Sequence, residues 1–234
     1  MKESVIEVTD LAVNRGGVQI FSGVNFRIGT GEVVAVRGGS GVGKSTLLAA
    51  LCGLLVPTAG EVQVRGERLD DRSDRARSAI RLRSFGLVFQ SDELLPELTL
   101  AENVTLPLRL GSRPRRTAAY RDQVVPLLTR LGIAGLADRL PGQVSGGQLQ
   151  RAAITRAVIH DPAIVLADEP TENLDEVTAR TAMRTLIALA RERGSAVVVV
   201  THDDQVAAAC DRSLTLDRAG LAGTQDADPV TVDG

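Results

Sequence analysis

The chain has 234 residues, of which 44% are hydrophobic and 24% charged, and its formal net charge is -2. This length and composition predict one globular catalytic domain with a sizeable buried core. The balance of charge gives no excess of positive groups for a phosphate backbone, and one Tyr, four Phe and no Trp leave little for base stacking. We therefore expect no nucleic-acid partner.

The apolar runs are too short to cross a membrane. The longest, residues 47–56, is about half of the roughly 20 residues that a spanning helix needs. The first ten residues, MKESVIEVTD, carry charges where a signal peptide needs a continuous apolar stretch, and they predict a strand. We expect a cytoplasmic protein. Cys52 and Cys210 lack metal-ligand spacing, which favours buried, reduced thiols.

The first strongly patterned segment is a strand, a glycine-rich loop and a helix. Residues 32–37 are rich in β-branched side chains, and residues 46–51 continue as a helix. Between them GGSGVGKS, at 38–45, matches GxxxxGK[ST], a loop whose backbone amides converge on phosphate oxygens at a helix N-terminus. Lys44 would reach the β- and γ-phosphates of a nucleoside triphosphate and Ser45 a bound Mg²⁺. This pattern predicts a P-loop.

The choice of basic residues supports the same interpretation. The chain has 27 Lys and Arg residues, but only Lys2 and Lys44 are lysines. A compact, rotatable ammonium among phosphates is not replaceable by the planar fork of arginine. A chain that otherwise uses arginine would still need lysine at position 44.

The middle of the chain predicts helices. Residues 70–83 mix both charge signs around a few apolar positions, as in a solvated helix, and the arginines at 113–116 favour a solvated helix start. From residue 99 to about 156 the pattern predicts helices broken by Pro114, Pro126 and Pro141, without a strong strand candidate. We interpret this segment as a helical insert.

The C-terminal third predicts an α/β core. The runs at 164–167 (IVLA) and 196–200 (AVVVV) are continuous rather than alternating, which is typical of parallel strands buried on both faces. Residues 176–193 have apolar positions at helical spacing, and Gly194 predicts the helix end. Residues 223–234 are small, acidic and aperiodic, and predict a flexible tail.

Six motifs follow one another along the chain: the P-loop, FGLVFQ ending in Gln90, VSGGQLQR at 144–151, IVLADEPT with Asp168 and Glu169, NLD at 173–175 and VTHDD with His202. In this order they resemble the motifs of the ATP-binding cassette (ABC) family, with VSGGQLQR at the place of its signature, and the resemblance runs from about residue 6 to residue 221. The resemblance implies an α/β P-loop NTPase core with a mostly parallel sheet, an N-terminal antiparallel β part and an inserted helical subdomain. We expect one ATPase domain over 1–222, with its core at 1–90 and 158–222 and the helical subdomain at about 91–157.

The residues of these motifs fit ATP hydrolysis with Mg²⁺. Asp168 can hold the Mg²⁺ shell while Glu169 orients or deprotonates the attacking water, although in isolation such a pair would also fit a solvated strand end. Gln90 could contact Mg²⁺ or the water, and without the family match it would be a surface glutamine. His202 can donate to the γ-phosphate, whereas His160 fits stabilisation by a helix dipole. The expected nucleotide ligands in the P-loop are Gly38, Gly39, Ser40, Gly41, Val42, Gly43, Lys44, Ser45 and Thr46, and the expected Mg²⁺ ligands are Ser45, Gln90 and Asp168.

A second anion site is expected at the signature-like motif. Ser145, Gly146, Gly147 and Gln148 open a helix that runs to about residue 160, so their amides and the helix dipole attract anions. Within one chain this site should lie far from the P-loop. The resemblance implies a head-to-tail homodimer, in which Ser145 and Gly147 of one subunit close over the ATP held by Lys44 of the other. It also implies that Asp175 contributes to nucleotide binding.

Two positions depart from the family pattern. Arg15 stands where an aromatic residue usually stacks on adenine, and a guanidinium can also stack on a purine. Glu172 stands where the family commonly has a small residue, and its negative charge near a phosphate site would slow turnover.

Residues 85–108 resemble the subfamily of macrolide exporters, lipoprotein-releasing complexes and the related cell-division cassette. That resemblance implies an ATPase on the inner face of the membrane that powers export or extraction through a separate permease. Leu94, Leu95 and Leu98 would form the floor of a groove for the permease's coupling helix, or would pack internally. One alternative is transmembrane signalling without cargo. Another is a soluble DNA-repair or ribosome-associated ATPase, against which the lack of coiled-coil insertion, zinc ligands and duplicated cassette argues.

Overall fold

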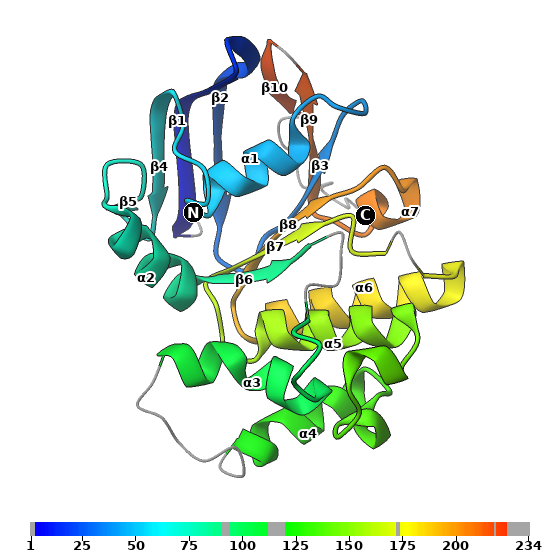
Figure 1. The fold of residues 1–234 in the computed structure, drawn as a ribbon. Helices are drawn as coiled ribbons and strands as arrows, with labels where there is room; N and C mark the ends of the chain where they lie inside the picture. Colours follow the sequence, from blue (N-terminus) through cyan, green and yellow to red (C-terminus); the bar gives the residue numbers. More distant parts are fainter. Residues whose placement is uncertain (1–2, 90–93, 112–119, 172–173, 218, 224–234) are drawn as a thin grey trace, which may run out of the picture.

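The structure, a computed structural model, describes residues 3–89, 94–111, 120–171, 174–217 and 219–223. Two β-sheets lie above a layer of helices in the view of Figure 1. The antiparallel sheet has the order β2-β1-β4-β5 and consists of β1 (Ser4–Arg15), β2 (Val18–Gly29), β4 (Ala59–Val64) and β5 (Glu67–Arg68). The charged N-terminal segment therefore forms a strand, as predicted.

The second sheet is mostly parallel and has the order β10-β9-β3-β8-β7-β6. Its strands are β3 (Val33–Arg37), β6 (Phe85–Val88), β7 (Ile164–Asp168), β8 (Ala196–Val200), β9 (Arg212–Asp217) and β10 (Gly220–Gly223). Its pairs are parallel except for β10 with β9. All residues of β7 and β8 are buried, because the sheet is covered on both faces. The predicted parallel core is confirmed.

The helices are α1 (Lys44–Leu51), α2 (Asp74–Ser84), α3 (Leu100–Gly111), α4 (Arg121–Arg130), α5 (Gly146–Val158), α6 (Glu176–Glu192) and α7 (Asp204–Ala208), with short 3-10 helices η2 (Ala134–Leu136) and η3 (Pro141–Gln143). Among the described residues, no helix has the length and apolar character to cross a membrane. Helix α6 ends at Glu192 with Arg193 as its C-cap, and Gly194 follows with a φ of 69° that suits glycine, so this predicted stop is confirmed.

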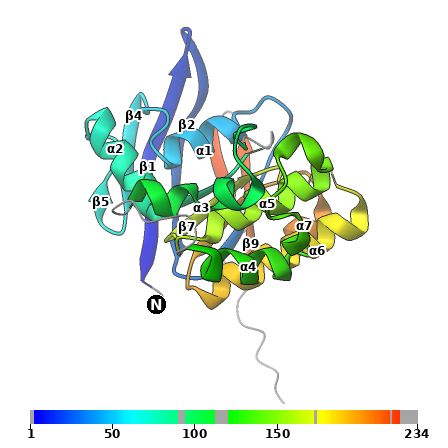
Figure 2. The same ribbon diagram turned by 60° about the horizontal axis from the view of Figure 1, so that its bottom comes forward.

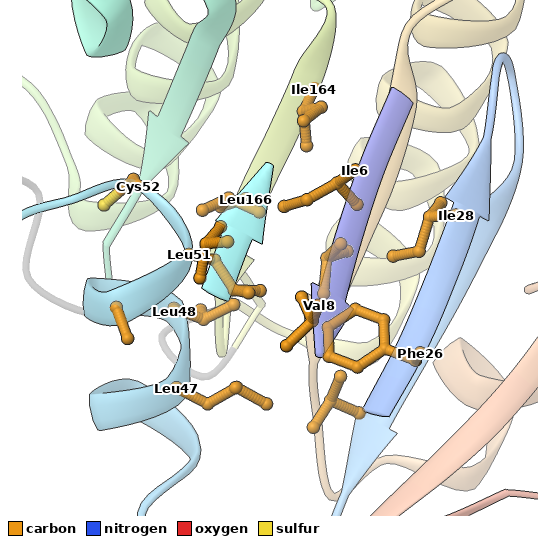
Figure 3. Packing of buried hydrophobic residues seen from close by; sticks show 14 of the residues in the cluster. Ile6, Val8, Phe26, Ile28, Leu47, Leu48, Leu51, Cys52, Ile164 and Leu166 are labelled. Atoms are coloured by element: carbon orange, nitrogen blue, oxygen red, sulfur yellow. The ribbon is translucent and has the colours of Figure 1, made fainter. Parts of the chain in front are cut away.

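Two hydrophobic clusters cover opposite faces of the parallel sheet. On one face, Leu47 and Leu51 of α1 lie in the same cluster as Ile6 of β1 and Ile164 and Leu166 of β7 (Figure 3). On the other face, Val165 and Ala167 of β7 belong to a cluster with the buried residues of α3 to α6. The alternation arises because successive side chains of a strand point to opposite faces. In Figure 2 the helical layer on the second face comes forward.

One predicted helix break is wrong. Pro126 lies inside α4, where it removes an amide donor to the carbonyl of Asp122. Both residues are exposed, so water can take that place, while Leu127 and Leu128 hold the helix on the core. Pro141 is the first residue of the 3-10 helix η3, which lies between α4 and α5. Pro114 lies outside the described residues.

The structure gives His160 a contact that the sequence did not predict. Helix α5 ends at Val158, and the Nε2 atom of His160 lies 3.1 Å from the carbonyl oxygen of Phe85. Burial lowers the pKa of His160 because it disfavours the charged imidazolium. The helix-dipole interpretation of His160 stays a prediction.

Candidate nucleotide-binding site

The carboxyl ends of β3, β7 and β8 meet at one cavity of about 330 Å³. Its lining consists of Gly38, Ser40, Gly41, Lys44, Ser45, Asp168, Glu169, Val200 and His202. Parallel strands bring their carboxyl ends to the same edge, which is where ligands bind in open α/β sheets. Tertiary structure thus brings together the glycine-rich loop, the acidic pair and the histidine that the sequence places far apart.

Glycine is required at two points of the loop that joins β3 to α1. Gly43 caps α1 with φ of 105°, and a Cβ there would lie 2.4 Å from Cγ2 of Ile20. At Gly38, with φ of 152°, a Cβ would lie 2.5 Å from the carbonyl oxygen of Leu216. Both positions combine a conformation that favours glycine with close contacts. The loop can therefore wrap tightly at the N-terminus of α1, whose first turn carries no acidic residue.

Lys44 is oriented by its own loop. Its Nζ atom donates to the carbonyl oxygens of Gly38 and Gly39 at 2.9 and 3.0 Å. An ammonium has three donors, so these two bonds leave one for a ligand. Together with the positive end of the α1 dipole, this arrangement favours anionic oxygens in the cavity.

The acidic pair lines the same cavity as the loop. Asp168 ends β7 and is 8% exposed. Glu169 follows with φ of 45°, a left-handed conformation that costs roughly 1–3 kcal/mol in non-glycine residues. Its amide donates to the Val200 carbonyl oxygen at 3.0 Å, which fixes this turn on the end of β8. Both residues of the acidic pair line the cavity.

His202 pairs with Glu169. Its Nδ1 atom lies 3.0 Å from Oε2 of Glu169, and the imidazole is 71% exposed whereas the carboxylate is 14% exposed. The histidine therefore stands at the solvent side of the cavity and the glutamate inside it. This geometry permits the imidazole to orient the carboxylate and to contact a ligand that enters from solvent.

The signature-like residues do not line this cavity. Ser145 is the N-cap of α5, and its amide donates to Oε1 of Gln148 at 2.9 Å. Ser145 and Gly146 are exposed, so the N-terminus of α5 is accessible from outside the chain. Helices α1 and α5 belong to the clusters on opposite faces of the parallel sheet (Figure 1).

Other predicted site residues also lie apart from the cavity lining. Asp175 caps α6 by accepting the amide of Thr178 at 3.1 Å, and hydrogen bonds from Thr178 lower the pKa of Asp175. Arg15 is exposed at the end of β1, paired with Val18. Gln90 and Glu172 lie outside the described residues.

One charged pair beside the cavity escaped the sequence analysis. Arg37, the last residue of β3, forms an ion pair with Asp204 at the start of α7, with a distance of 2.5 Å between Nη2 and Oδ1. Arg37 also lines a neighbouring cavity of about 330 Å³, which shares Gly38 and His202 with the first. The only sequence signal was a charged residue directly before the glycine-rich loop.

Comparisons with known proteins agree with this geometry. A family model described as ABC transporter matches residues 21–172. The lipoprotein-releasing system ATP-binding protein LolD of Xanthomonas oryzae pv. oryzae is 44% identical over 202 residues, which cover 86% of this chain and 82% of that protein. LolD of Bordetella pertussis is 43% identical over 206 residues, with 87% of each chain covered.

Solved structures are similar over nearly the whole chain. A dimeric ATP-binding cassette in a post-hydrolysis state, bound to ADP and Pi, superposes with a TM-score of 0.87 at 35% identity. The match covers 94% of this chain and 99% of the cassette. The α/β P-loop NTPase fold implied by the motifs is therefore confirmed. The chain belongs to the ABC transporter family, as an ATP-binding cassette subunit.

Proposed function

We propose that this chain hydrolyses ATP to power export or extraction through a separate membrane permease, by closure of a cassette homodimer around ATP. The observation that carries the proposal is the convergence of Lys44 and Ser45 with Asp168, Glu169 and His202 around one cavity. The names of the relatives, which belong to lipoprotein-releasing systems, support extraction as the kind of work.

Phosphate binding falls to the glycine-rich loop. The proposed phosphate ligands are the amides of residues 38–46 together with the Lys44 ammonium. The residues present also fit Mg²⁺, since the Ser45 hydroxyl and the Asp168 carboxylate line the same cavity and oxygen is the ligand that Mg²⁺ prefers. We assign Gln90 to the same Mg²⁺ shell. When bound, the ion would neutralise charge on the transferred phosphoryl group.

Glu169 is the proposed general base. Its carboxylate is mostly buried in the cavity, and His202 holds it from the solvent side at 3.0 Å. This contact orients the carboxylate to position the attacking water and to accept its proton. When both ring nitrogens of His202 carry protons, the imidazole can donate to Glu169 and to the γ-phosphate at once.

A second copy of the chain completes the proposed site. The exposed N-terminus of α5, at residues 145–148, would close over ATP held by the partner, with Asp175 nearby. Dimeric solved relatives support this arrangement. ATP then holds the two subunits together, and hydrolysis releases them. We propose that the helical subdomain at about 91–157 transmits this change from Gln90.

The proposed permease site is an apolar groove formed by α2, β6, α3 and α5. It has a volume of about 320 Å³, and its apolar lining includes Leu82, Phe89 and Leu106. Near it in sequence, Leu95 is 47% exposed and can contact a coupling helix, whereas Leu94 is buried and packs internally. Docking there would place the chain on the inner face of the membrane.

Glu169→Gln tests the hydrolytic site, because the amide keeps the shape of the side chain but cannot accept the proton. We expect the turnover of ATP to fall about 100-fold or more. Nucleotide binding should persist, and gel filtration should show a dimer with ATP and Mg²⁺ but a monomer without ATP. Glu97→Gln, at an exposed glutamate outside the cavity, is the matched control. Normal turnover by Glu169→Gln would remove Glu169 from this role.

The transport assignment is tested with the same trapped variant. The tagged Glu169→Gln chain is purified from gently solubilised membranes with ATP and Mg²⁺, and its partners are identified by mass spectrometry. A stoichiometric permease with several membrane spans is expected. Recovery of a homodimer alone, or of ribosomes or DNA-repair proteins, would reject transport and leave the ATPase chemistry intact.

A further inference from the structure

The loop that carries His202 leaves the sheet beside the end of β3. Val36 of β3 and Val200 of β8 are paired in register, and the amide of Thr201 donates to the Val36 carbonyl oxygen at 3.2 Å. Arg37 and His202 therefore leave neighbouring strand ends. Both side chains line the second cavity next to the nucleotide site.

Helix α7, which follows His202, is tied to β3 by a charged contact. Asp203 caps α7 by accepting the amide of Gln205 at 2.7 Å, and Asp204 is the first residue of the helix. The carboxylate of Asp204 accepts from Nη2 of Arg37 at 2.5 Å, although the two residues are 167 positions apart in sequence. The ion pair therefore joins the end of β3 to the start of α7, directly after the short segment 201–203 that carries His202.

The same helix start is also tied to α6. Oε1 of Gln205 accepts from Arg180 at 2.7 Å, and Nε2 of Gln205 donates to Oε1 of Glu176 at 3.3 Å. Residues 204 and 205 are thus held on one side by β3 and on the other by α6. A helix of only five residues has little rigidity of its own, so these contacts can set where it begins.

We propose that the Arg37–Asp204 ion pair is a positioning device for His202, which fixes the loop so that the imidazole meets Glu169. Arg37 and Asp204 are positioning residues, since they act through His202 and not on ATP. This inference rests on the proposed ATP hydrolysis and adds a determinant of its rate. The contacts of Gln205 with α6 support the same loop from the opposite side.

Because the side chains of Arg37 and Asp204 are partly exposed, the positioning of His202 can be distinguished from a contribution to folding stability. The side chains of Arg37 and Asp204 are 41% and 84% exposed, and such ion pairs contribute little to folding stability. Their loss should leave the melting temperature nearly unchanged. It should still misplace a catalytic group, for which small displacements strongly affect the rate.

Steady-state and single-turnover hydrolysis by the purified full-length chain with Mg²⁺ and ATP tests the proposal. Arg37→Ala and the isosteric Asp204→Asn should each lower kcat by roughly three- to tenfold, with KM for ATP within about twofold of wild type. The double variant should be no slower than the slower single variant, because both changes break the same contact. In a His202→Ala background, Arg37→Ala should change the single-turnover rate by less than about 1.5-fold.

Arg83→Ala is the matched control, since Arg83 forms an ion pair of the same 2.5 Å length with Glu67, away from the cavity lining. Its kcat should equal that of wild type. An unchanged kcat in both Arg37→Ala and Asp204→Asn, or an equal loss from Arg37→Ala with and without His202, would overturn the proposal. A raised KM at unchanged kcat would instead make Arg37 a direct ATP ligand. If wild type itself hydrolyses no ATP, the proposed function fails rather than this inference alone.

Discussion

Gly86→Ala should destabilise the chain strongly, because this glycine sits where β6 contacts α5. Gly86 is buried in β6, paired with Val165. A Cβ built there would lie 2.0 Å from the carbonyl oxygen of Ala157 and 2.8 Å from its carbon. Carbon atoms in contact normally lie about 3.5–4.0 Å apart, so the strand and the helix must separate.

The size of the destabilisation by Gly86→Ala follows from the fact that the new Cβ meets a backbone carbonyl group, that of Ala157. Overpacking a core typically costs 1–3 kcal/mol, and a backbone carbonyl of a helix cannot turn aside as a side chain can. We therefore expect about 3 kcal/mol. For a chain of this length, 1 kcal/mol lowers the melting temperature by about 2–4 °C, so Gly86→Ala should melt about 6–12 °C below wild type.

The assay is thermal unfolding followed by circular dichroism, with urea denaturation as a second measure. Gly135→Ala is the control, because Gly135 is exposed in η2 and an added Cβ there meets nothing within 4 Å. Its melting temperature should stay within about 2 °C of wild type. A Gly86→Ala variant that also melts within 2 °C of wild type would refute the packing argument.

Two further predictions concern nucleotide binding and pH. Arg15→Ala should weaken ATP binding about two- to fivefold, which corresponds to about 0.5–1 kcal/mol for a stacked guanidinium at an exposed site. Titration calorimetry measures the dissociation constant of ATP, with Arg75→Ala as a control at an exposed arginine. An unchanged dissociation constant in Arg15→Ala would make Arg15 a surface residue. Burial raises the pKa of the Cys210 thiol to about 11 from an ordinary value of 9.0. Because the folded state keeps its proton longer than the unfolded state, the stability from this thiol is present below pH 9 and is lost as the pH rises through 11. The melting temperature should therefore fall more between pH 9 and 11 in wild type than in Cys210→Ala, and equal falls would contradict the assignment.

Local sequence determined the elements of the core. The continuous apolar runs predicted β7 and β8 because strands buried on both faces need no polar alternation. The glycines before Lys44 predicted a tight loop, since the positive φ angles at Gly38, Gly41 and Gly43 suit residues without a Cβ. Pro126 misled the same local reasoning, because its freed carbonyl can be hydrated on an exposed side of α4.

The family resemblance named candidate residues around ATP, and the sequence placed the signature-like site far from the P-loop within one chain. The structure groups Lys44, Asp168, Glu169 and His202, and places residues 145–148 outside that lining. Their separation depends on which face of the parallel sheet each helix covers, which no local pattern encodes. The assignment of roles to these residues stays a proposal, tested by the variants above.

By itself the sequence determined four strands, at the N-terminus, 32–37, 164–167 and 196–200, with the glycine-rich loop and the motifs, because each depends on residues close together in the chain. Only the tertiary structure decided that Arg37 meets Asp204, that Glu169 meets His202 and that His160 is half-buried beside Phe85. These contacts join residues far apart in sequence, through strand order and helix packing. Their geometry follows from the cooperative burial of the two cores rather than from any segment alone.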